Sequence, residues 1–364
     1  MRVLAGLVLI MSINGIFDRT PKRPPSIVTK EALWYDKLQN KFVQCKLCFR
    51  ECTIPPKGRG VCGARENSNG VLYSLGYARP CAIQVDPIEK EPVLHFYPGT
   101  EILCMATTGC PFRCKFCQNW HISQVQPEDV SYYLLRPAEI IKLAKHHKCI
   151  GISHTYTEPT VSYEYIYEIS QLARKAGLKN IIHTCGAMNP EPLKTLLPLL
   201  DAVTVDLKGF TQEFYETAIP NASLEHVLNN LKIIKKSGVW LELVTLVIPT
   251  YNDDSTDIRN MCNWILENLG PDVPLHFSGF FPGHKFKNLP ITPIETLELA
   301  KRIAKDVGLN YVTIGNLPGH RDNSTFCPKC GKVLVKRVHF EVLSNNIVNG
   351  KCKFCGTSIP GVWR

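Results

Sequence analysis

The sequence lacks an apolar run long enough to cross a bilayer. Its N-terminal stretch VLAGLVLIM (3–11) resembles the apolar core of a signal peptide, but it has only nine residues and no clear cleavage site follows it. A misassigned start, a degenerate export signal and a buried N-terminal strand all fit this stretch. The chain also lacks a long low-complexity tract and an internal repeat, so nothing indicates extended disorder.

Charged residues make up only 20% of the 364 residues, and apolar residues make up 45%. This mix indicates a globular chain with room for one large α/β domain and one or two small modules. The formal net charge of +10 suggests an anionic partner, but it counts every thiol as neutral. Two four-thiolate zinc sites and a three-thiolate iron–sulfur cluster would lower the charge to about +5. Nucleic acid as a partner therefore loses much of its support.

The sixteen cysteines include eleven that fall into three close groups. CxxC pairs are typical of metal sites in reducing compartments, whereas disulfide scaffolds are usually short and secreted. We therefore expect a cytoplasmic protein, although the N-terminal apolar run leaves export open. The other five cysteines are scattered, several of them in apolar runs, and are expected to be small core residues: Cys81, Cys104, Cys149, Cys185 and Cys262.

Short β-rich runs alternate with helical patterns over most of the chain. Helix ends are marked by Pro137 near one start and by Gly177 and Gly308 after two others. This alternation predicts an α/β fold whose parallel sheet is closed or partly closed as a barrel, with the active site at the carboxyl ends of the strands. Strands are expected at 101–107, 149–155, 180–184, 202–207, 240–248 and 274–280, with 311–315 as a candidate seventh.

The loop TTGCPFRCKFCQNWHIS (107–123) contains three cysteines and lacks a fourth. A closed zinc site and an ordinary four-iron cluster each take four protein ligands. Three thiolates on a four-iron cluster leave one iron without a protein ligand, and an open position distinguishes reactive metal sites from structural ones. We therefore expect Cys110, Cys114 and Cys117 to hold a 4Fe–4S cluster whose open iron binds a substrate or cosubstrate over the mouth of the barrel.

Two further cysteine groups have four members each. The C-terminal group is a pair of CxxC knuckles, each followed by glycine, and predicts a closed structural site with zinc favoured over iron: Cys327, Cys330, Cys352 and Cys355. The N-terminal group has the spacing C-x2-C-x3-C-x9-C around a loop rich in proline and glycine: Cys45, Cys48, Cys52 and Cys62. A structural zinc and an auxiliary iron–sulfur cluster both fit this second group, and its spacing does not choose between them.

The C-x3-C-x2-C motif, with Phe116 before its last cysteine, resembles the signature of radical S-adenosylmethionine (SAM) enzymes. In that family the amino and carboxylate groups of SAM chelate the open iron. One electron cleaves SAM to methionine and a 5′-deoxyadenosyl radical, which would abstract hydrogen from a protein or small-molecule substrate. The resemblance thus implies a 4Fe–4S cluster and SAM as cofactors, and an electron donor such as ferredoxin or flavodoxin.

From Trp34 to Trp363 the chain is similar to the radical SAM enzyme of the AmmeMemoRadiSam system, which is related to the pyruvate formate-lyase activating enzymes. The resemblance implies a partial (βα)6 TIM-like barrel and association with Memo-type and AMMECR-type proteins. The matching stretches are CKLCFRECTIPPKGRGVCGARENSNG, VDPIEKEPVLHFYPGT, TTGCPFRCKFCQNWHIS, TYTEPT, DLKG, GNLPG, CPKCGK and CKFCGTSIPGVW. Four regions are expected: an N-terminal extension (1–30), a four-cysteine module (31–95), the radical SAM barrel (96–320) and a zinc-ribbon-like module (321–364).

The activase pattern also implies a SAM pocket. In TYTEP, Glu158 matches the acceptor for the SAM ammonium group, while Tyr156 and Thr157 replace two glycines. Asp206 and Lys208 match an Asp-Leu-Lys beside the SAM carboxylate.

Three more residues come from the same pattern. Thr184 matches a threonine of that neighbourhood, and Phe116 would pack against the adenine. His183 stands where the activases have an acidic residue that helps to hold a monovalent cation, so such a cation site is in doubt here.

Each of these residues has a simpler interpretation. Glu158 could be an exposed carboxylate near a helix N-terminus, Asp206 and Lys208 a plain ion pair, and Thr184 a turn residue. For three other histidines, packing or surface positions are expected: His121, His276 and His284.

Two other functional classes are alternatives to the radical SAM enzyme. One is a metal-ribbon nucleic-acid-binding protein, which should interleave aromatic and basic residues; KVLVKRVHFEVL (332–343) is a weak version of that pattern. The other is a non-catalytic iron–sulfur protein that senses redox state.

Overall fold

The computed structural model describes residues 30–317 and 319–363. The apolar run 3–11 and almost all of the expected N-terminal extension lie outside the described residues. Within the part that is described, no helix combines the length and the apolar character needed to cross a membrane.

Seven parallel strands, each paired with the next along the chain, form the central sheet. All six expected strands and the candidate seventh are present, so this part of the prediction is confirmed. The last strand lies at an edge of the sheet and does not return to the first, which makes the barrel partial. The strands are β8 (Glu101–Thr107), β9 (Gly151–His154), β10 (Lys179–Thr184), β11 (Ala202–Asp206), β12 (Trp240–Val247), β13 (Leu275–Gly279) and β14 (Val312–Gly315).

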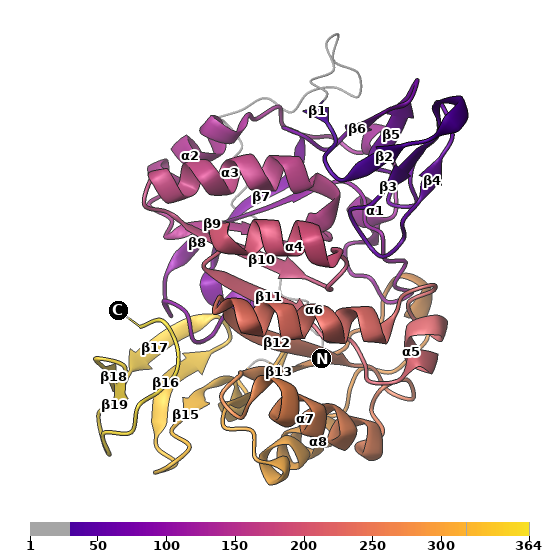
Figure 1. Cartoon of the computed structure of the whole chain (residues 1–364). Helices are drawn as coiled ribbons and strands as arrows, with labels where there is room; N and C mark the ends of the chain where they lie inside the picture. The colour runs from indigo at the N-terminus through magenta and orange to yellow at the C-terminus, as the bar shows by residue number, and fades with distance from the viewer. Residues whose placement is uncertain (1–29, 318, 364) are drawn as a thin grey trace, which may run out of the picture.

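Six helices connect these seven strands, which gives six strand–helix units and a final strand (Figure 1). Pro137 occupies the first position of the first of them, where its missing N–H costs nothing. Gly238 and Gly308 end two others at φ of 80° and 112°, values that a side chain would strain. The connecting helices are α2 (Pro137–His146), α3 (Tyr163–Lys175), α4 (Pro190–Leu196), α6 (Leu224–Ser237), α7 (Ser255–Leu269) and α8 (Ile294–Val307); α1 (Trp120–Ser123) and α5 (Gln212–Thr217) are short.

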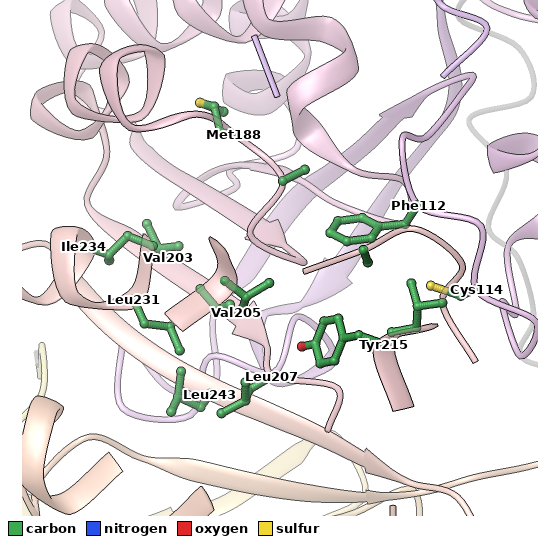
Figure 2. Close-up of a cluster of buried hydrophobic side chains, with 14 of the residues drawn as sticks. Phe112, Cys114, Met188, Val203, Val205, Leu207, Tyr215, Leu231, Ile234 and Leu243 are labelled. Atoms are coloured by element: carbon green, nitrogen blue, oxygen red, sulfur yellow. The ribbon is translucent and has the colours of Figure 1, made fainter. Parts of the chain in front are cut away.

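The outward face of the sheet packs against the helices. Figure 2 shows Val203 and Val205 of β11 beside Leu231 and Ile234 of α6, and all four side chains are buried. Because side chains alternate along a strand, this packing turns Asp206 toward the inside of the barrel. The hydrophobic cluster thus fixes which polar side chains face inward.

The same apolar cluster reaches the cysteine loop. Figure 2 shows Phe112 and Tyr215 close to Cys114, and all three side chains are buried. Apolar packing therefore holds the loop, in addition to any ligand that its thiols bind.

An eighth strand, β7 (Pro80–Pro87), pairs antiparallel with β8 and extends the sheet. It falls within the range 31–95 that we assigned to the N-terminal module, although it belongs to the barrel sheet. The domain boundaries as a whole stay predictions.

The segment after β7 covers the inside of the partial barrel. Val93 and Phe96 pack against inward residues of the strands. The backbone N–H groups of Leu94 and His95 each donate a 2.8 Å hydrogen bond to the carboxylate of Glu242 on β12. A buried carboxylate that accepts two backbone N–H groups fixes this segment in position.

The N-terminal module consists of two small antiparallel sheets (Figure 1, indigo). It is anchored to the barrel by Arg65, whose Nη2 lies 2.7 and 2.8 Å from the two carboxylate oxygens of Glu164 on α3. Both side chains are buried. The sheets contain β1 (Lys30–Glu31), β5 (Arg65–Ser68) and β6 (Val71–Ser74), and β2 (Tyr35–Lys37), β3 (Val43–Cys45) and β4 (Thr53–Ile54).

The C-terminal module (Figure 1, yellow) docks through Arg337, whose side chain is fully buried. Its guanidinium donates to the carbonyl of Leu94 at 2.6 Å and to the hydroxyl of Thr325 at 2.9 Å, and lies 3.5 Å from the carboxylate of Glu89. The C-terminal module is thus bonded to the segment after β7, which covers the inside of the barrel. Its strands are β15 (Thr325–Phe326), β16 (Val333–Val338), β17 (Glu341–Asn345), β18 (Ile347–Val348) and β19 (Lys351–Cys352).

Replacing Arg337 by methionine should loosen this docking. The Glu89 carboxylate, whose side chain is 1% exposed, would be left as a buried and uncompensated charge, which costs about 3–5 kcal/mol. Limited proteolysis in increasing urea should release the C-terminal module of Arg337→Met at a lower concentration than that of the parent. Lys194→Met, which removes an exposed ion pair, is the control and should change little. Equal protease resistance in Arg337→Met and the parent would contradict the role of this contact.

Candidate active site

A cavity of about 460 Å³ lies at the carboxyl ends of the barrel strands. Its walls come from the cysteine loop, the strand ends, the segment after β7 and the C-terminal module. All but one of the expected cluster and SAM residues line it: Cys110, Cys114, Cys117, Phe116, Glu158, Asp206 and Lys208. Thr184 is the exception, and it contacts this wall through Glu158.

The cysteine loop leaves β8 through Gly109, which has a φ of 105°. A Cβ at this position would lie 2.5 Å from the carbonyl oxygen of Cys62, so only glycine fits. Burial raises the pKa of the Cys110 thiol, and the nearby Glu158 carboxylate adds to the effect. Burial also raises the pKa of Cys114 to about 12. These thiols would therefore become thiolates when a metal cation binds, as the residues of an iron–sulfur site must.

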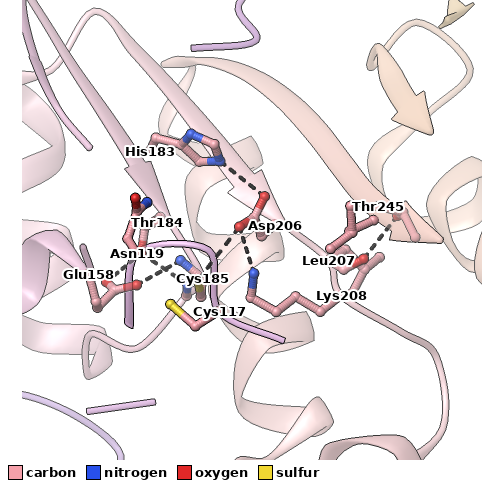
Figure 3. A network of polar contacts seen from close by, with 12 residues as sticks. Cys117, Asn119, Glu158, His183, Thr184, Cys185, Asp206, Leu207, Lys208 and Thr245 are labelled. Carbon is pink, nitrogen blue, oxygen red and sulfur yellow. Dashed lines mark hydrogen bonds and ion pairs between the residues drawn. The ribbon is translucent and has the colours of Figure 1, made fainter. Parts of the chain in front are cut away.

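Glu158 is 2% exposed, so the alternative of an exposed carboxylate is wrong. Figure 3 shows its carboxylate at the end of β10, where it accepts from the hydroxyl of Thr184 at 2.6 Å and from the N–H of Cys185 at 2.7 Å. The hydroxyl of Thr160 donates to it at 2.8 Å. Burial raises the pKa of Glu158, and these three hydrogen bonds oppose that rise. The hydrogen bonds hold a carboxylate at the cavity wall and leave about one of its four lone-pair sites free to accept from an amino group.

Asp206 lies between two cationic side chains (Figure 3). Its carboxylate is 3.0 Å from Nε2 of His183 and 2.7 Å from Nζ of Lys208. Burial disfavours charge on all three groups, but their mutual attraction outweighs it. This attraction lowers the pKa of Asp206 and raises the pKa values of His183 and Lys208. With His183 protonated the trio carries one net positive charge, which suits an anionic group in the cavity.

Phe116 forms an aromatic part of the wall. Its ring is buried and lies 6.2 Å from the ring of Phe214 and 6.0 Å from that of Phe286. Nζ of Lys208 is 5.6 Å from the centre of the ring. The ring is thus fixed by its neighbours next to the charged trio.

Several cavity residues were not predicted. Cys185, expected in the core, lines the cavity with its sulfur 3.7 Å from the Asp206 carboxylate. His276 is buried as expected, but it also lines the cavity and bonds Glu242 and Thr313 at 2.7 Å each. The one signal in the sequence was Glu242, the charged residue in the otherwise apolar run WLELVTLVI (240–248), because a buried carboxylate needs polar partners such as His276.

The C-terminal module also contributes to the wall through Phe340, at the hairpin between β16 and β17. No sequence pattern could have indicated this contact, because it depends on how the module docks against the barrel.

The four C-terminal cysteines come together, with all their sulfur atoms within 4.8 Å of one another. The sulfur of Cys327 lies 3.6 Å from that of Cys355, and the sulfur of Cys330 lies 3.8 Å from that of Cys352. Four thiolates around one zinc at 2.3 Å stand about 3.8 Å apart, so this set fits a single tetrahedral ion.

The four N-terminal cysteines also surround a single site. They line a small cavity together with Arg50 and Arg65. The structure therefore brings together all eleven grouped cysteines at the three places that the spacing indicated.

Comparison with known proteins agrees with this geometry. Residues 105–262 match the model of the Radical SAM superfamily. An uncharacterized protein of Methanocaldococcus jannaschii is 45% identical over 332 residues, which are 91% of this chain and 98% of that protein. The chain belongs to the radical SAM superfamily.

This radical SAM protein is also similar to an activating enzyme and, more distantly, to a solved structure. A pyruvate formate-lyase-activating enzyme of Listeria monocytogenes is 26% identical over 212 residues, which cover 52% of this chain and 80% of that enzyme. The crystal structure of a radical SAM methyltransferase from Sphaerobacter thermophilus superposes with a TM-score of 0.47 at 15% identity, covering 65% of this chain and 71% of that one.

Replacing Cys330 by serine should remove one of four ligands, release the ion and unfold roughly residues 325–364, because metal binding and local folding are one process in such modules. Elemental analysis should show the loss of the bound metal, and amide hydrogen exchange should show the loss of protection in the same segment. Lys329→Ala, an exposed neighbour, should retain both. A Cys330→Ser protein with its full metal content and unchanged protection would contradict the assignment of a four-cysteine metal site.

Proposed function

We propose that this radical SAM enzyme holds its 4Fe–4S cluster on Cys110, Cys114 and Cys117 and binds SAM in the adjoining cavity. The observation that supports this most is the meeting of three thiols, a buried carboxylate and a partly buried cationic trio around one space at the strand ends. The residues fit the group: the thiols supply the metal ligands, and the polar side chains complement the charges of an amino acid moiety.

When bound, the cluster and SAM supply the one-electron cleavage of SAM to methionine and a 5′-deoxyadenosyl radical. The chain's own residues orient the cosubstrate. Glu158 would accept hydrogen bonds from the amino group, Lys208 with His183 would attract the carboxylate, and Phe116 would contact the adenine. Asp206 positions both cations and keeps their charges from repelling one another.

The substrate of this reaction would be a protein or a small molecule that loses a hydrogen atom. Phe340 and the segment after β7 cover the cavity and would shield the reaction from water. The stretches quoted above further support membership of the AmmeMemoRadiSam group and partnership with Memo-type and AMMECR-type proteins. A low-potential donor such as ferredoxin or flavodoxin and a cytoplasmic location complete the proposal, with zinc in the C-terminal module.

The nucleic-acid-binding alternative is weakened by the position of Arg337. This residue is central to the basic stretch 332–343, yet it is buried in contacts with Glu89 and Leu94. It is therefore not available to contact phosphates.

Changing Cys110, Cys114 and Cys117 together to alanine should abolish SAM cleavage, because the cluster loses all its protein ligands. The measurement is the formation of methionine and 5′-deoxyadenosine by anaerobically reconstituted protein with a low-potential reductant. Cys149→Ala removes a buried cysteine outside the three groups and should keep the activity. Persistent 5′-deoxyadenosine formation in the triple variant would remove the central assignment. Cleavage by the parent would also exclude the redox-sensing alternative.

Glu158→Gln should weaken SAM binding while the cluster stays intact. The glutamine oxygen can still accept from the N–H of Cys185, and its amide can donate to the hydroxyls of Thr160 and Thr184, so the fold should tolerate the change. Loss of a charge-assisted contact costs about 1.5–3 kcal/mol, or about ten- to a hundred-fold in affinity. Equilibrium binding of SAM checks this, with the exposed Glu225→Gln as control. An unchanged dissociation constant at full iron content would show that Glu158 does not contact SAM.

A further inference from the structure

We propose that Cys45, Cys48, Cys52 and Cys62 hold a second 4Fe–4S cluster, and not a zinc ion, and that this cluster exchanges one electron with the cluster on the barrel loop. The identity of the metal is independent of the function proposed above, whereas the electron exchange depends on it.

The spacing of the sulfur atoms differs between the two four-cysteine sets. Among the described residues, the four C-terminal sulfur atoms all lie within 4.8 Å of one another, whereas the four N-terminal sulfur atoms do not. Ligands of one zinc ion must stand about 3.8 Å apart. Thiolates on a four-iron cluster bind different corners of a cube and therefore stand farther apart. The wider N-terminal set favours the cluster.

The four cysteines line a single cavity. It measures about 20 Å³ and is lined by all four cysteines and by apolar side chains that include Leu47, Ile54 and Val161. This is more than the space that one water molecule needs, about 10–15 Å³. The four cysteines thus face one common space.

Arg65 points to the chemistry of the bound group. It lines the cavity and its side chain is 2% exposed. Its Nη2 is engaged by Glu164, but its Nε–H is buried and has no hydrogen-bond partner among the described residues. None of the four thiols accepts this N–H. A zinc ion would offer it no acceptor either, whereas the sulfide ions of an iron–sulfur cluster accept such hydrogen bonds.

The site adjoins the cysteine loop of the barrel. Pro111, which follows Cys110, lines the N-terminal cavity, and its carbonyl accepts from Nε of Arg50 at 2.9 Å. Arg50 lines the same cavity, and the carbonyl of Cys62 sits against Gly109. Arg50 and Pro111 thus connect the N-terminal cavity directly to the cysteine loop.

This proximity gives the second cluster a role in reduction. A low-potential one-electron donor protein would reduce the N-terminal cluster, which would then be oxidised as it passes that electron to the barrel cluster. No bond forms or breaks in the transfer and no proton moves. The N-terminal module would thus be the entry point for the electron on which SAM cleavage depends.

Metal analysis of anaerobically reconstituted full-length protein tests the assignment. The parent should contain about eight irons and one zinc per chain, and the triple alanine variant of the barrel loop should keep about four irons and the zinc. Cys330→Ser should keep about eight irons and lose the zinc. A triple variant with no iron and two zincs would overturn the proposal. Because the triple variant keeps the N-terminal cysteines, this result does not depend on whether N-terminal variants fold.

Electron paramagnetic resonance tests the exchange. In the reduced parent the spectrum should be broadened by coupling between two nearby spins, and should differ from the sum of the spectra of the triple variant and of Cys45→Ala/Cys62→Ala. If the double variant does not fold, the parent spectrum at several microwave powers, compared with that of the triple variant alone, gives the same test. An uncoupled parent spectrum would exclude the exchange.

The two proposals fail separately. Iron in the triple variant, together with a parent that does not cleave SAM, would refute the proposed function and keep the second cluster. SAM cleavage by a parent that contains two zincs would support the proposed function and refute the second cluster.

Discussion

The burial of two thiols of the cysteine loop, Cys110 and Cys114, at the carboxyl end of β8 is the constraint on which the rest of the site depends. Buried thiols stay neutral unless a cation offsets the cost of their charge, and burial raises the pKa of Cys110 and Cys114. The loop is held by apolar packing around Phe112 and cannot rearrange freely. The same packing directs β11 so that Asp206 faces inward. The loop and the charged side chains around it are thus parts of one folded unit.

The two small modules hold this unit from different sides (Figure 1), each through a buried arginine–carboxylate pair. Arg65 with Glu164 fixes the N-terminal module beside the cysteine loop, and Arg337 with Glu89 fixes the C-terminal module over the inside of the barrel. Breaking one partner of such a pair is costly, so the modules are expected to stay in place during turnover. An otherwise open partial barrel is covered in this way without further strands.

Much of the architecture could be predicted from local patterns. Strand 101–107 was predicted with the observed bounds because its apolar residues and the loop after it are clear, and Pro137 and Gly308 marked helix ends correctly. The contribution of Phe340 to the cavity wall and the hydrogen bonds from the segment after β7 to Glu242 could not be predicted, because those contacts join segments about 150 to 250 residues apart. The spacing of the N-terminal cysteines in the sequence could not decide which metal they hold either, because the distances between their sulfur atoms are set by the fold.

The claim at the centre of this account is that three protein thiolates leave one iron open to SAM. Electron–nuclear double resonance on the reduced protein tests it directly, with SAM isotopically labelled at the amino nitrogen and carboxylate oxygen of its methionine part. The account predicts hyperfine coupling of both labels to the reduced cluster, since both atoms would bind the open iron. A normal reduced-cluster signal with no coupling to either label, in protein saturated with SAM, would contradict it.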